Sequence, residues 1–463
     1  MTDWTRESGA RIAEAVRSGD ITARSVVEQH LDVIEARNPR LNAFTDITGG
    51  RALATAERID ARRRRGEALP ALAGVPFAVK NLFDIAGLPT RAGSKINRDR
   101  PPSERDATAI TRLEAAGAIL MGGLNMGAYA YDFTGRNAHD SHSRNPHDPE
   151  RMTGGSSGGS GGCVAAGMAP VALGSDTNGS IRVPSSLCGL FGLKPTYGAL
   201  SRGGSFPFVT SLDHVGPLAR SVEDLALVHD AMRGPDPRDP ACWGGSAEPL
   251  APQIEGGIAG MRIARAGGYF TRLASPQALE AVETVAGALE AWRVAEIPEA
   301  PRARAAAFIM TMTEGAALHQ DRLRRRVADF DPEVRDRLIA GAMLPGAWYH
   351  RAQVFRAWYK AAVAELFRQV DVLIAPATPV SAPLVDQKVF TVEGQDLPVR
   401  ANLGLFTQPI SFIGLPVAAV PVWPENGMPI GVQVIAAAGR DDLVLRVARH
   451  LEREGICTAR VAA

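Results

Sequence analysis

Short apolar runs that end in polar loops occur both early and late in this 463-residue chain. In the first half, GVPFAVK (residues 74–80) and VALGSD (171–176) have the length and texture of buried strands. Near the end, DVLIAPATPV, GLPVAAVPV and GVQVIAAA have the same texture. Helical patterns separate the two groups, so the sequence predicts an α/β fold. Because the strands return so late, we expect them to rejoin one central sheet in a single large domain over residues 1–463.

Helices are expected on either side of these strands. Residues 22–37 carry apolar side chains at helical spacing, Thr22 can cap the start, and Pro39 is expected to end the helix. A loop rich in Pro, Gly and Asp at about 230–260 leads into alternating helical and polar stretches, which we interpret as a layer on one side of the core. A final helix is expected over 441–454.

Composition limits the classes of partner. The 51 basic residues nearly balance the 50 acidic ones, which gives no reason to expect binding to nucleic acid or to an anionic membrane. The basic run at 61–65 lies among acidic residues and is interpreted as a solvated helix face. No stretch has the roughly 18 to 20 apolar residues of a spanning helix, and the polar N-terminus lacks the apolar core of a signal peptide, so we expect a cytoplasmic protein.

The cysteines are expected to be free thiols in a reducing compartment. They are far apart in the sequence and show no metal-ligand spacing with histidines, so the sequence predicts neither a disulfide framework nor a metal site, and no motif calls for a cofactor. The four positions are Cys163, Cys188, Cys242 and Cys457.

The glycine-rich segment GGSSGGS at residues 154–160 contains Ser156 and is followed by Ser180 in SDTNGSIRVPS. A glycine-rich turn lets the backbone approach a phosphate or a developing oxyanion closely. The phosphate interpretation is disfavoured, because neither the P-loop lysine nor the dinucleotide-binding fingerprint is present. In isolation, the string would also suit a flexible glycine-serine loop. Ser180, however, follows a turn of small residues whose N–H groups can converge on one point, as an oxyanion hole requires.

A nucleophilic serine needs a base. Four of the nine histidines are candidates, but none of the four lies in a G-x-S-x-G context or has an evident carboxylate partner, so surface or capping roles are expected for them. Lys80 ends the strand-like run GVPFAVK, and burial among apolar groups can leave a lysine neutral enough to accept a proton. Taken alone, it would also suit a solvated strand end. The four histidines are His139, His142, His147 and His214.

Several segments together resemble the amidase signature family, and the resemblance extends over nearly the whole chain. It implies the family's fold, a single α/β domain with a mixed, twisted central sheet covered by helices. The clearest matches are GVPFAVKNLFDIAG (74–87), RMTGGSSGGSGG (151–162), GSDTNGSIRVPSSLCGLFGLKPTYG (174–198) and SLDHVGPLARSVEDLAL (211–227).

The same resemblance implies a Ser-Ser-Lys triad. Ser180 would attack an amide carbonyl, Ser156, which follows a cis peptide bond in the family, would relay the proton, and neutral Lys80 would be the final base. Many family members carry Gly where this chain has Asn178, and asparagine tolerates positive φ better than most residues. Four successive backbone N–H groups would stabilise the oxyanion, those of Thr177, Asn178, Gly179 and Ser180.

The position of one arginine suggests the charge of the substrate. Glutamine-using members of this family, which serve amidotransferases, pair an arginine for the substrate carboxylate with an aspartate for its amino group. The matching positions here are Arg337 and Gly404. An arginine without the aspartate favours a substrate that has a carboxylate but no α-ammonium. Alternatively, Arg337 forms a structural ion pair on a helix.

Four strings are similar to the 1-carboxybiuret hydrolase family of cyanuric acid degradation. This implies hydrolysis of a small anionic acyl-urea with release of ammonia, and a small helical partner subunit in a heterotetramer, with a homodimer as the simpler assembly. Arg400 is a second candidate for anion binding, with a surface role as its alternative. The strings are GSDTNGSIRVPSSLCG, SLDHVGPLARS, AMRGPDPRDPAC and LPVRANLGLFTQPISFIGLP.

Two other functions stay open on the sequence. The first is the glutamine-hydrolysing subunit of a tRNA-dependent amidotransferase, the only case in which a nucleic acid would be a partner. The second is a non-catalytic assembly subunit that retains the fold.

Overall fold

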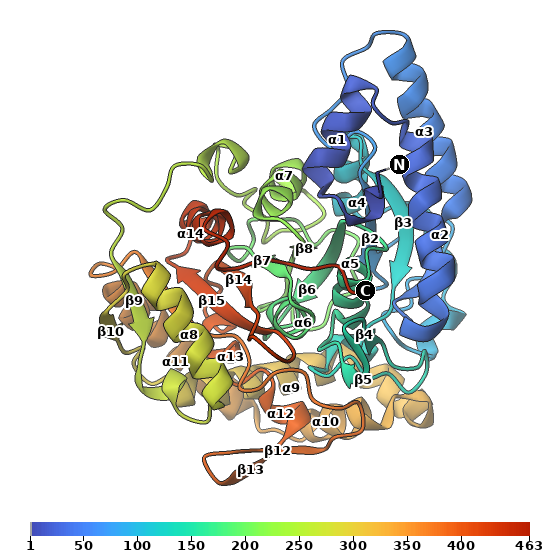
Figure 1. Cartoon of the computed structure of the whole chain (residues 1–463). Coiled ribbons are helices and arrows are strands. Elements are labelled where there is room, and N and C mark those ends of the chain that lie inside the picture. The colour runs from blue at the N-terminus through green and yellow to red at the C-terminus, as the bar shows by residue number, and fades with distance from the viewer. Residues whose placement is uncertain (1) are drawn as a thin grey trace.

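A computed structural model describes residues 2–463, and its central feature is one sheet of eleven strands. Figure 1 shows this sheet running across the molecule, with early strands toward one end and late strands toward the other. In spatial order, the strands are β1 (Phe44–Ile47), β3 (Ile119–Leu124), β2 (Pro76–Lys80), β6 (Val171–Asp176), β8 (His214–Ala219), β7 (Phe191–Lys194), β14 (Val417–Val422), β15 (Ile430–Ala436), β11 (Val372–Pro376), β9 (Ile263–Ala266) and β10 (Arg293–Ala295).

The sheet mixes parallel and antiparallel pairs. β3, β2 and β6 are parallel neighbours, as are β11, β9 and β10, whereas the strands between β6 and β11 pair antiparallel. The five runs identified in the sequence form β2, β6, β11, β14 and β15, and every residue of these strands is buried. The α/β class with a mixed sheet is therefore confirmed.

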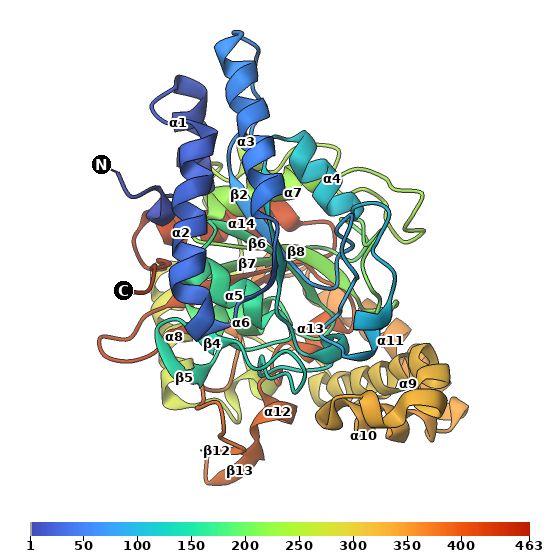
Figure 2. The ribbon, with the colours of Figure 1, turned by 90° about the vertical axis from the view of Figure 1, so that its right-hand side faces the viewer.

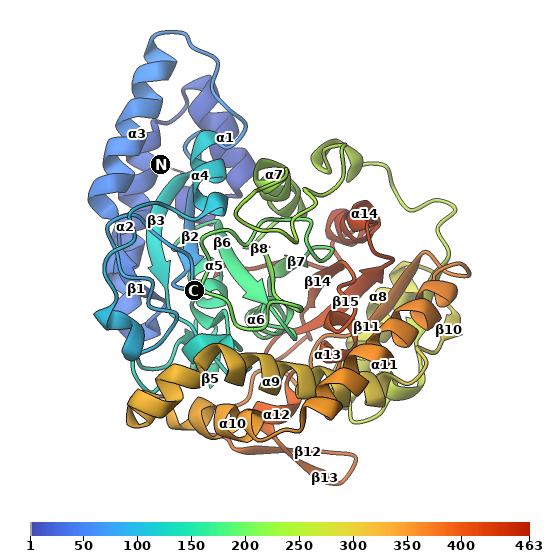
Figure 3. The same ribbon diagram turned by 180° about the vertical axis from the view of Figure 1, so that it is seen from behind.

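Helices cover both faces of the sheet. In Figures 1 and 2, α7 (Val222–Met232) and α14 (Asp441–Arg453) lie on one side, and α5 (Gly158–Ala165) and α6 (Arg182–Cys188) lie on the other. Seen from behind, α9 (Ala300–Arg326), α10 (Pro332–Ala342) and α11 (Gly346–Leu366) form a layer along one edge of the molecule (Figure 3). This layer was expected from the alternating helical stretches after residue 260.

Two details differ from the expectations. The helix that starts after Thr22 is α2 (Ala23–Leu41), which continues through Pro39 and ends at Asn42 in the left-handed conformation. Pro39 is tolerated because it lies in the last turn, where the loss of one N–H interrupts little of the helix. The edge strands β9 and β10 were not anticipated, because they are short, partly exposed and rich in arginine.

Among residues 2–463, no helix is both long and apolar enough to cross a bilayer.

The remaining helices and two small sheets connect these layers. The elements are α1 (Gly9–Ser18), α3 (Gly49–Arg64), α4 (Thr108–Ala115), α8 (Pro276–Ala288), α12 (Val399–Asn402), α13 (Gln408–Ser411), and two small sheets, β4 (Arg144–Asn145) with β5 (Asp148–Met152) and β12 (Val389–Val392) with β13 (Gln395–Pro398).

Candidate active site

Lys80 lies at the end of β2, where the neighbouring parallel strand β6 also ends. Because adjacent parallel strands end at the same edge of a sheet, this edge brings together side chains that are far apart in sequence. Lys80 is fully buried, and its Nζ lies 2.7 Å from Ser156 Oγ and 2.8 Å from Ser175 Oγ. Ser175, the penultimate residue of β6, was not singled out in the sequence, because its contact with Lys80 joins strands that are distant in the chain.

Ser156 lies in the loop that leads into α5, after a cis peptide bond between Gly155 and Ser156. Two backbone hydrogen bonds tie this loop to residues 127–133. The Gly127 N–H donates to the Ser156 carbonyl at 3.1 Å, and the Gly155 N–H donates to the Phe133 carbonyl at 2.9 Å. The segment that carries Tyr131 is therefore fixed against the segment that carries Ser156.

The environment of Lys80 favours its neutral form. Burial lowers the pKa of Lys80 to about 7, against the opposing effect of the negative charges of Asp176, Asp213 and Asp132. At neutral pH, a large share of Lys80 is therefore an amine that can accept a proton from the hydroxyl beside it. The alternative of a solvated strand end does not fit a side chain with no exposed surface.

Ser180 is buried, with an exposed fraction of 3%, and lies in the turn between β6 and α6. Among the described residues, the backbone N–H groups of Thr177, Asn178 and Ser180 have no internal acceptor. The structure differs from the sequence expectation at the fourth group, because the Gly179 N–H donates to Asp176 Oδ1 at 2.6 Å. Three N–H groups of this turn therefore remain available to an oxyanion.

A buried ion pair between Asp176 and Arg182 holds the turn, and neither residue was anticipated. Arg182 Nε and Nη2 donate to the two Asp176 oxygens at 3.0 Å each, and both side chains have no exposed surface. Burial opposes the charged carboxylate, but the charge and hydrogen bonds of Arg182 prevail and hold the pKa of Asp176 below its usual range. An arginine inside the apolar segment IRVPSSLCG was the available sequence signal.

Further contacts attach this turn to the late part of the chain. Arg182 Nη1 donates to the Thr407 carbonyl at 3.1 Å and to Gln433 Oε1 at 2.7 Å. Thr407 Oγ1 in turn donates to the Asn178 carbonyl at 2.6 Å. On the other side, Thr177 Oγ1 donates to Asp213 Oδ1 at 2.6 Å. The turn is thus fixed from both sides before any substrate binds, as electrostatic catalysis requires.

The structure brings Arg337 and Arg400 together at Tyr131. Arg337 Nη1 lies 3.4 Å from the Tyr131 carbonyl, with its guanidinium over the Tyr131 ring at 3.9 Å from the centroid. Arg400 Nη2 donates to the same carbonyl at 3.2 Å. Arg400 also faces carboxylates, with Nε 3.6 Å from Asp132 Oδ1 and Nη1 3.5 Å from Glu333 Oε2.

Among the described residues, Arg337 has no carboxylate within salt-bridge distance. The alternative of a structural ion pair therefore fits Arg400 rather than Arg337. Burial lowers the pKa of Arg337, and the nearby Arg400 adds to this effect, while Tyr131 and the negative charge of Asp132 oppose it.

The space at Gly404 is filled by an aromatic ring. A Cβ atom at Gly404 would lie 2.4 Å from Phe133 Cζ, so no side chain fits there unless the ring moves. Phe133 belongs to the segment that is hydrogen-bonded to Gly155. An aspartate side chain at this position would therefore clash with the Phe133 ring.

None of the four candidate histidines is hydrogen-bonded to Ser156 or Ser180. His214 was expected at the surface or in a cap, but it is buried, with Nδ1 3.0 Å from the Asp176 carbonyl and 2.6 Å from the Leu212 carbonyl. Burial lowers its pKa well below the usual value. His139, His142 and His147 are partly exposed and contact backbone groups.

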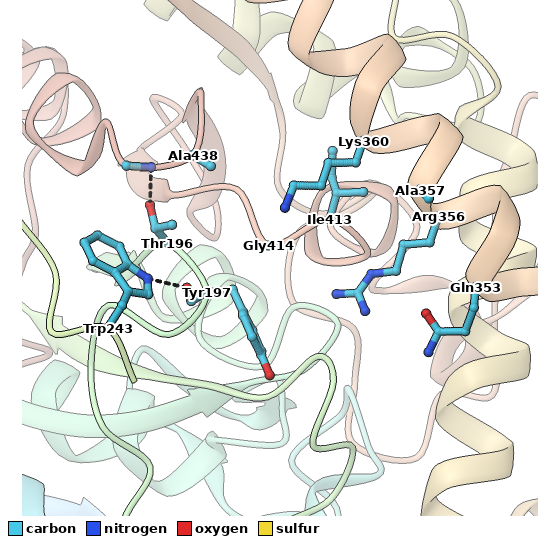
Figure 4. Close-up of a pocket in the computed structure, with 11 residues that line it drawn as sticks. Thr196, Tyr197, Trp243, Gln353, Arg356, Ala357, Lys360, Ile413, Gly414 and Ala438 are labelled. Atoms are coloured by element: carbon cyan, nitrogen blue, oxygen red, sulfur yellow. Dashed lines mark hydrogen bonds between the residues drawn. The ribbon is translucent and has the colours of Figure 1, made fainter. Parts of the chain in front are cut away.

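A separate hollow of about 650 Å³ opens beside α11. Figure 4 shows Arg356 and Lys360 projecting from α11 toward Tyr197 and Trp243. The residues that line it include no serine, histidine or carboxylate, so the hollow has no nucleophile paired with a base. It is not the reaction centre.

The mixed sheet and the buried Lys80 beside Ser156 fit one class of protein. The chain belongs to the amidase family, whose model matches residues 25–445. It is a hydrolase of the amidase signature fold.

Particular relatives agree with this assignment. The chain is 55% identical over 447 residues to AtzE, the 1-carboxybiuret hydrolase subunit of Pseudomonas sp. (strain ADP), covering 96% of this chain and 98% of the relative. It is 37% identical over 481 residues to a glutamyl-tRNA(Gln) amidotransferase subunit of Roseiflexus castenholzii, covering 98% of this chain and 96% of the relative.

A solved structure that is 54% identical superposes with a TM-score of 0.97, covering 99% of this chain and 100% of the other. It is described as a vestigial protein complex that reveals the origins of an s-triazine catabolic enzyme.

Proposed function

We propose that this protein hydrolyses 1-carboxybiuret, or a related small carboxylated acyl-urea, with release of ammonia. The observation that carries the proposal is the fully buried Lys80, 2.7 Å from Ser156 Oγ and with a pKa of about 7. A lysine in this state can serve as a general base, which a structural lysine at the surface cannot. The substrate is inferred from the relative that is 55% identical and bears the 1-carboxybiuret hydrolase name.

In the first half of the reaction, Ser180 Oγ attacks the carbonyl carbon of the terminal amide. Its proton passes to Ser156, and the Ser156 proton passes to the neutral amine of Lys80. The resulting oxyanion accepts hydrogen bonds from the N–H groups of Thr177, Asn178 and Ser180. When the carbon–nitrogen bond breaks, the relay returns the proton to the leaving nitrogen and ammonia departs.

In the second half, water attacks the acyl group on Ser180. The relay removes a proton from this water, and the serine oxygen takes that proton back as it leaves. The products are a carboxylated fragment and the regenerated enzyme. The same three residues serve both halves, so no metal ion or cofactor is required by the scheme.

Arg337 is assigned to the substrate carboxylate. Among the described residues, no carboxylate lies within salt-bridge distance of Arg337, and the Tyr131 ring and carbonyl contact its guanidinium. An arginine already ordered in this way can form a charge-assisted hydrogen bond to an anion without further ordering. Arg400 faces Asp132 and Glu333 and is assigned to holding the Tyr131 segment in position.

Packing at Gly404 argues against the amidotransferase alternative. A glutamine substrate would bring an α-ammonium that needs a negative partner, and the Phe133 ring fills the corresponding space. A buried ammonium without a partner is strongly disfavoured. The intact set of Lys80, Ser156 and Ser180 argues against a non-catalytic role.

A small helical partner subunit is part of the proposal. It rests on the 55% identical relative, whose name makes it one subunit of a hydrolase, and on the similar structure that is described as a complex. The activity assay should therefore be run with and without the candidate partner chain.

The test is ammonia release from freshly generated 1-carboxybiuret by the purified protein. Ammonia is expected in stoichiometric yield, and Ser180→Ala is expected to lower the rate by roughly 10³-fold or more, as for other nucleophile deletions. If neither the protein alone nor the protein with its partner releases ammonia from 1-carboxybiuret or related acyl-ureas, the proposed substrate class is wrong. Glutamine hydrolysis coupled to a charged tRNA would favour the amidotransferase function instead.

A further inference from the structure

Asn178 lies in the catalytic turn at a position where many family members carry glycine. Only one end of its side-chain amide has a hydrogen-bond partner among the described residues. Its exposed fraction is 6%. The side-chain Nδ2 donates to Thr311 Oγ1 on α9 at 2.9 Å, whereas Oδ1 is buried with no hydrogen-bond partner among the described residues. Buried polar atoms are normally paired, so an unpaired acceptor in the residue before Gly179 and Ser180 is a candidate partner for a donor on a ligand.

The side chain is also held in a fixed direction. Thr407 Oγ1 donates to the Asn178 backbone carbonyl at 2.6 Å, which fixes the backbone, and Thr311 Oγ1 accepts a hydrogen bond from the side-chain amide nitrogen. With the backbone carbonyl and the amide nitrogen both held within the protein, Oδ1 is the one polar atom of the Asn178 side chain that is left without a partner among the described residues. Such an acceptor is ready for a donor without losing further side-chain freedom.

A series of packing contacts connects α9, which holds the Asn178 side chain, to the proposed anion site. Phe208 packs against the Tyr131 ring with centroids 4.8 Å apart. Phe208 also lies against Gly315 of α9, one turn after Thr311, and a Cβ at Gly315 would lie 3.0 Å from its ring. Contacts through Thr311 and Gly315 of α9 and through Phe208 therefore link Asn178 to Tyr131, the residue under Arg337.

We propose that Asn178 Oδ1 accepts a hydrogen bond from the N–H group adjacent to the attacked carbonyl, so that the site selects ureas over alkyl amides. This inference rests on the proposed function and adds the residue that recognises the N–H group of the urea. An acyl-urea carries an N–H at that position, whereas an alkyl carboxamide carries a methylene that cannot donate. A site built around a hydrogen bond leaves its own polar atom unpaired when an analogue lacks the donor, and the analogue is rejected.

Two compounds form a matched pair for the test. N-carbamoyl-β-alanine and glutaramate have the same length and the same carboxylate and differ only in an N–H or a methylene next to the terminal carboxamide. Binding of each is measured by calorimetry on the Ser180→Ala protein, assembled with its partner if one is required, so that turnover does not interfere. N-carbamoyl-β-alanine is expected to bind at least about 10-fold more tightly, the usual size of one hydrogen bond in a closed site.

Replacing Asn178 by Gly, the residue common in the family, should remove this preference. In the Ser180→Ala background, Asn178→Gly is expected to weaken N-carbamoyl-β-alanine about 10-fold and to change glutaramate less than about 3-fold. Thr311→Val should reduce the preference in part, because Oδ1 is then no longer held in place. Thr313→Val, two residues along the same helix, is the control and should leave both affinities unchanged.

The outcomes separate this inference from the proposed function. Equal affinity for the two compounds, or a preference that survives Asn178→Gly, overturns the role of Asn178 even if the unmodified protein releases ammonia from 1-carboxybiuret. Binding of neither compound also overturns it. Failure of the unmodified protein to release ammonia from any acyl-urea overturns the proposed function itself.

Discussion

At the residue scale, the chemistry depends on a lysine whose burial removes most of the usual preference for the charged form. Lys80 has a pKa of about 7 in place of 10.5, with burial as the largest cause. The active form is neutral, so kcat/KM should be constant well above pH 7 and fall about 10-fold per pH unit below it. A pH–rate profile, with circular dichroism to confirm the fold at each pH, measures this. Constant kcat/KM down to pH 5 would exclude Lys80 as the base.

A second prediction at this scale concerns Arg337. Its replacement by Met should raise KM for a carboxylated substrate by about 10-fold or more, because a charge-assisted hydrogen bond to the carboxylate is lost. Arg335→Met is the matched control on the same helix, since Arg335 is paired with its neighbour Asp336. Steady-state kinetics with both variants measure the effect. Equal KM values in the two variants would remove Arg337 from the substrate site.

At the scale of elements, the catalytic turn depends on one buried ion pair. Arg182 satisfies both oxygens of Asp176, which in turn accepts the Gly179 N–H. Arg182→Ala leaves a buried carboxylate unpaired and should destabilise the protein by about 3 to 5 kcal/mol. Denaturant unfolding measures the loss, with Arg182→Lys as a variant that keeps the charge but not the two-pronged contact. An alanine variant as stable as the unmodified protein would show that the turn does not need the pair.

The elements also show what the sequence could and could not predict. The runs at β2 and β6 were visible because fully buried strands have continuous apolar texture, and Lys80 was conspicuous because it ends such a run. Asp176 was missed although its partner Arg182 lies in the same segment of the sequence. Ser175 and Tyr131 were not visible, because their roles come from contacts between segments distant in the chain. The buried position of His214 was missed for the same reason.

At the scale of the whole molecule, the sheet joins both ends of the chain. β7 from the first half pairs with β14 from the last part, and Arg182 reaches Gln433 across the same junction. The early part of the chain therefore has neighbouring strands and hydrogen-bond partners in the late part. The late strands were correctly placed in one sheet from the sequence, whereas β9 and β10 at its edge lacked the apolar texture that identifies a strand.

This continuity predicts cooperative unfolding. Far-ultraviolet circular dichroism and tryptophan fluorescence should report one transition at the same denaturant midpoint, because no boundary divides the sheet into separate cores. Two transitions with different midpoints would show that residues 1–463 comprise more than one domain.

The central claim, that Ser180 is a nucleophile activated through Ser156 and Lys80, is tested most directly by a fluorophosphonate probe and intact-protein mass spectrometry. One adduct per chain is expected, located at Ser180 by peptide mapping, with a labelling rate that falls as the pH drops below about 7. Ser180→Ala should abolish the adduct, and Lys80→Ala should slow its formation by orders of magnitude. No adduct on the unmodified protein, or an adduct that persists in Ser180→Ala, would contradict this mechanism.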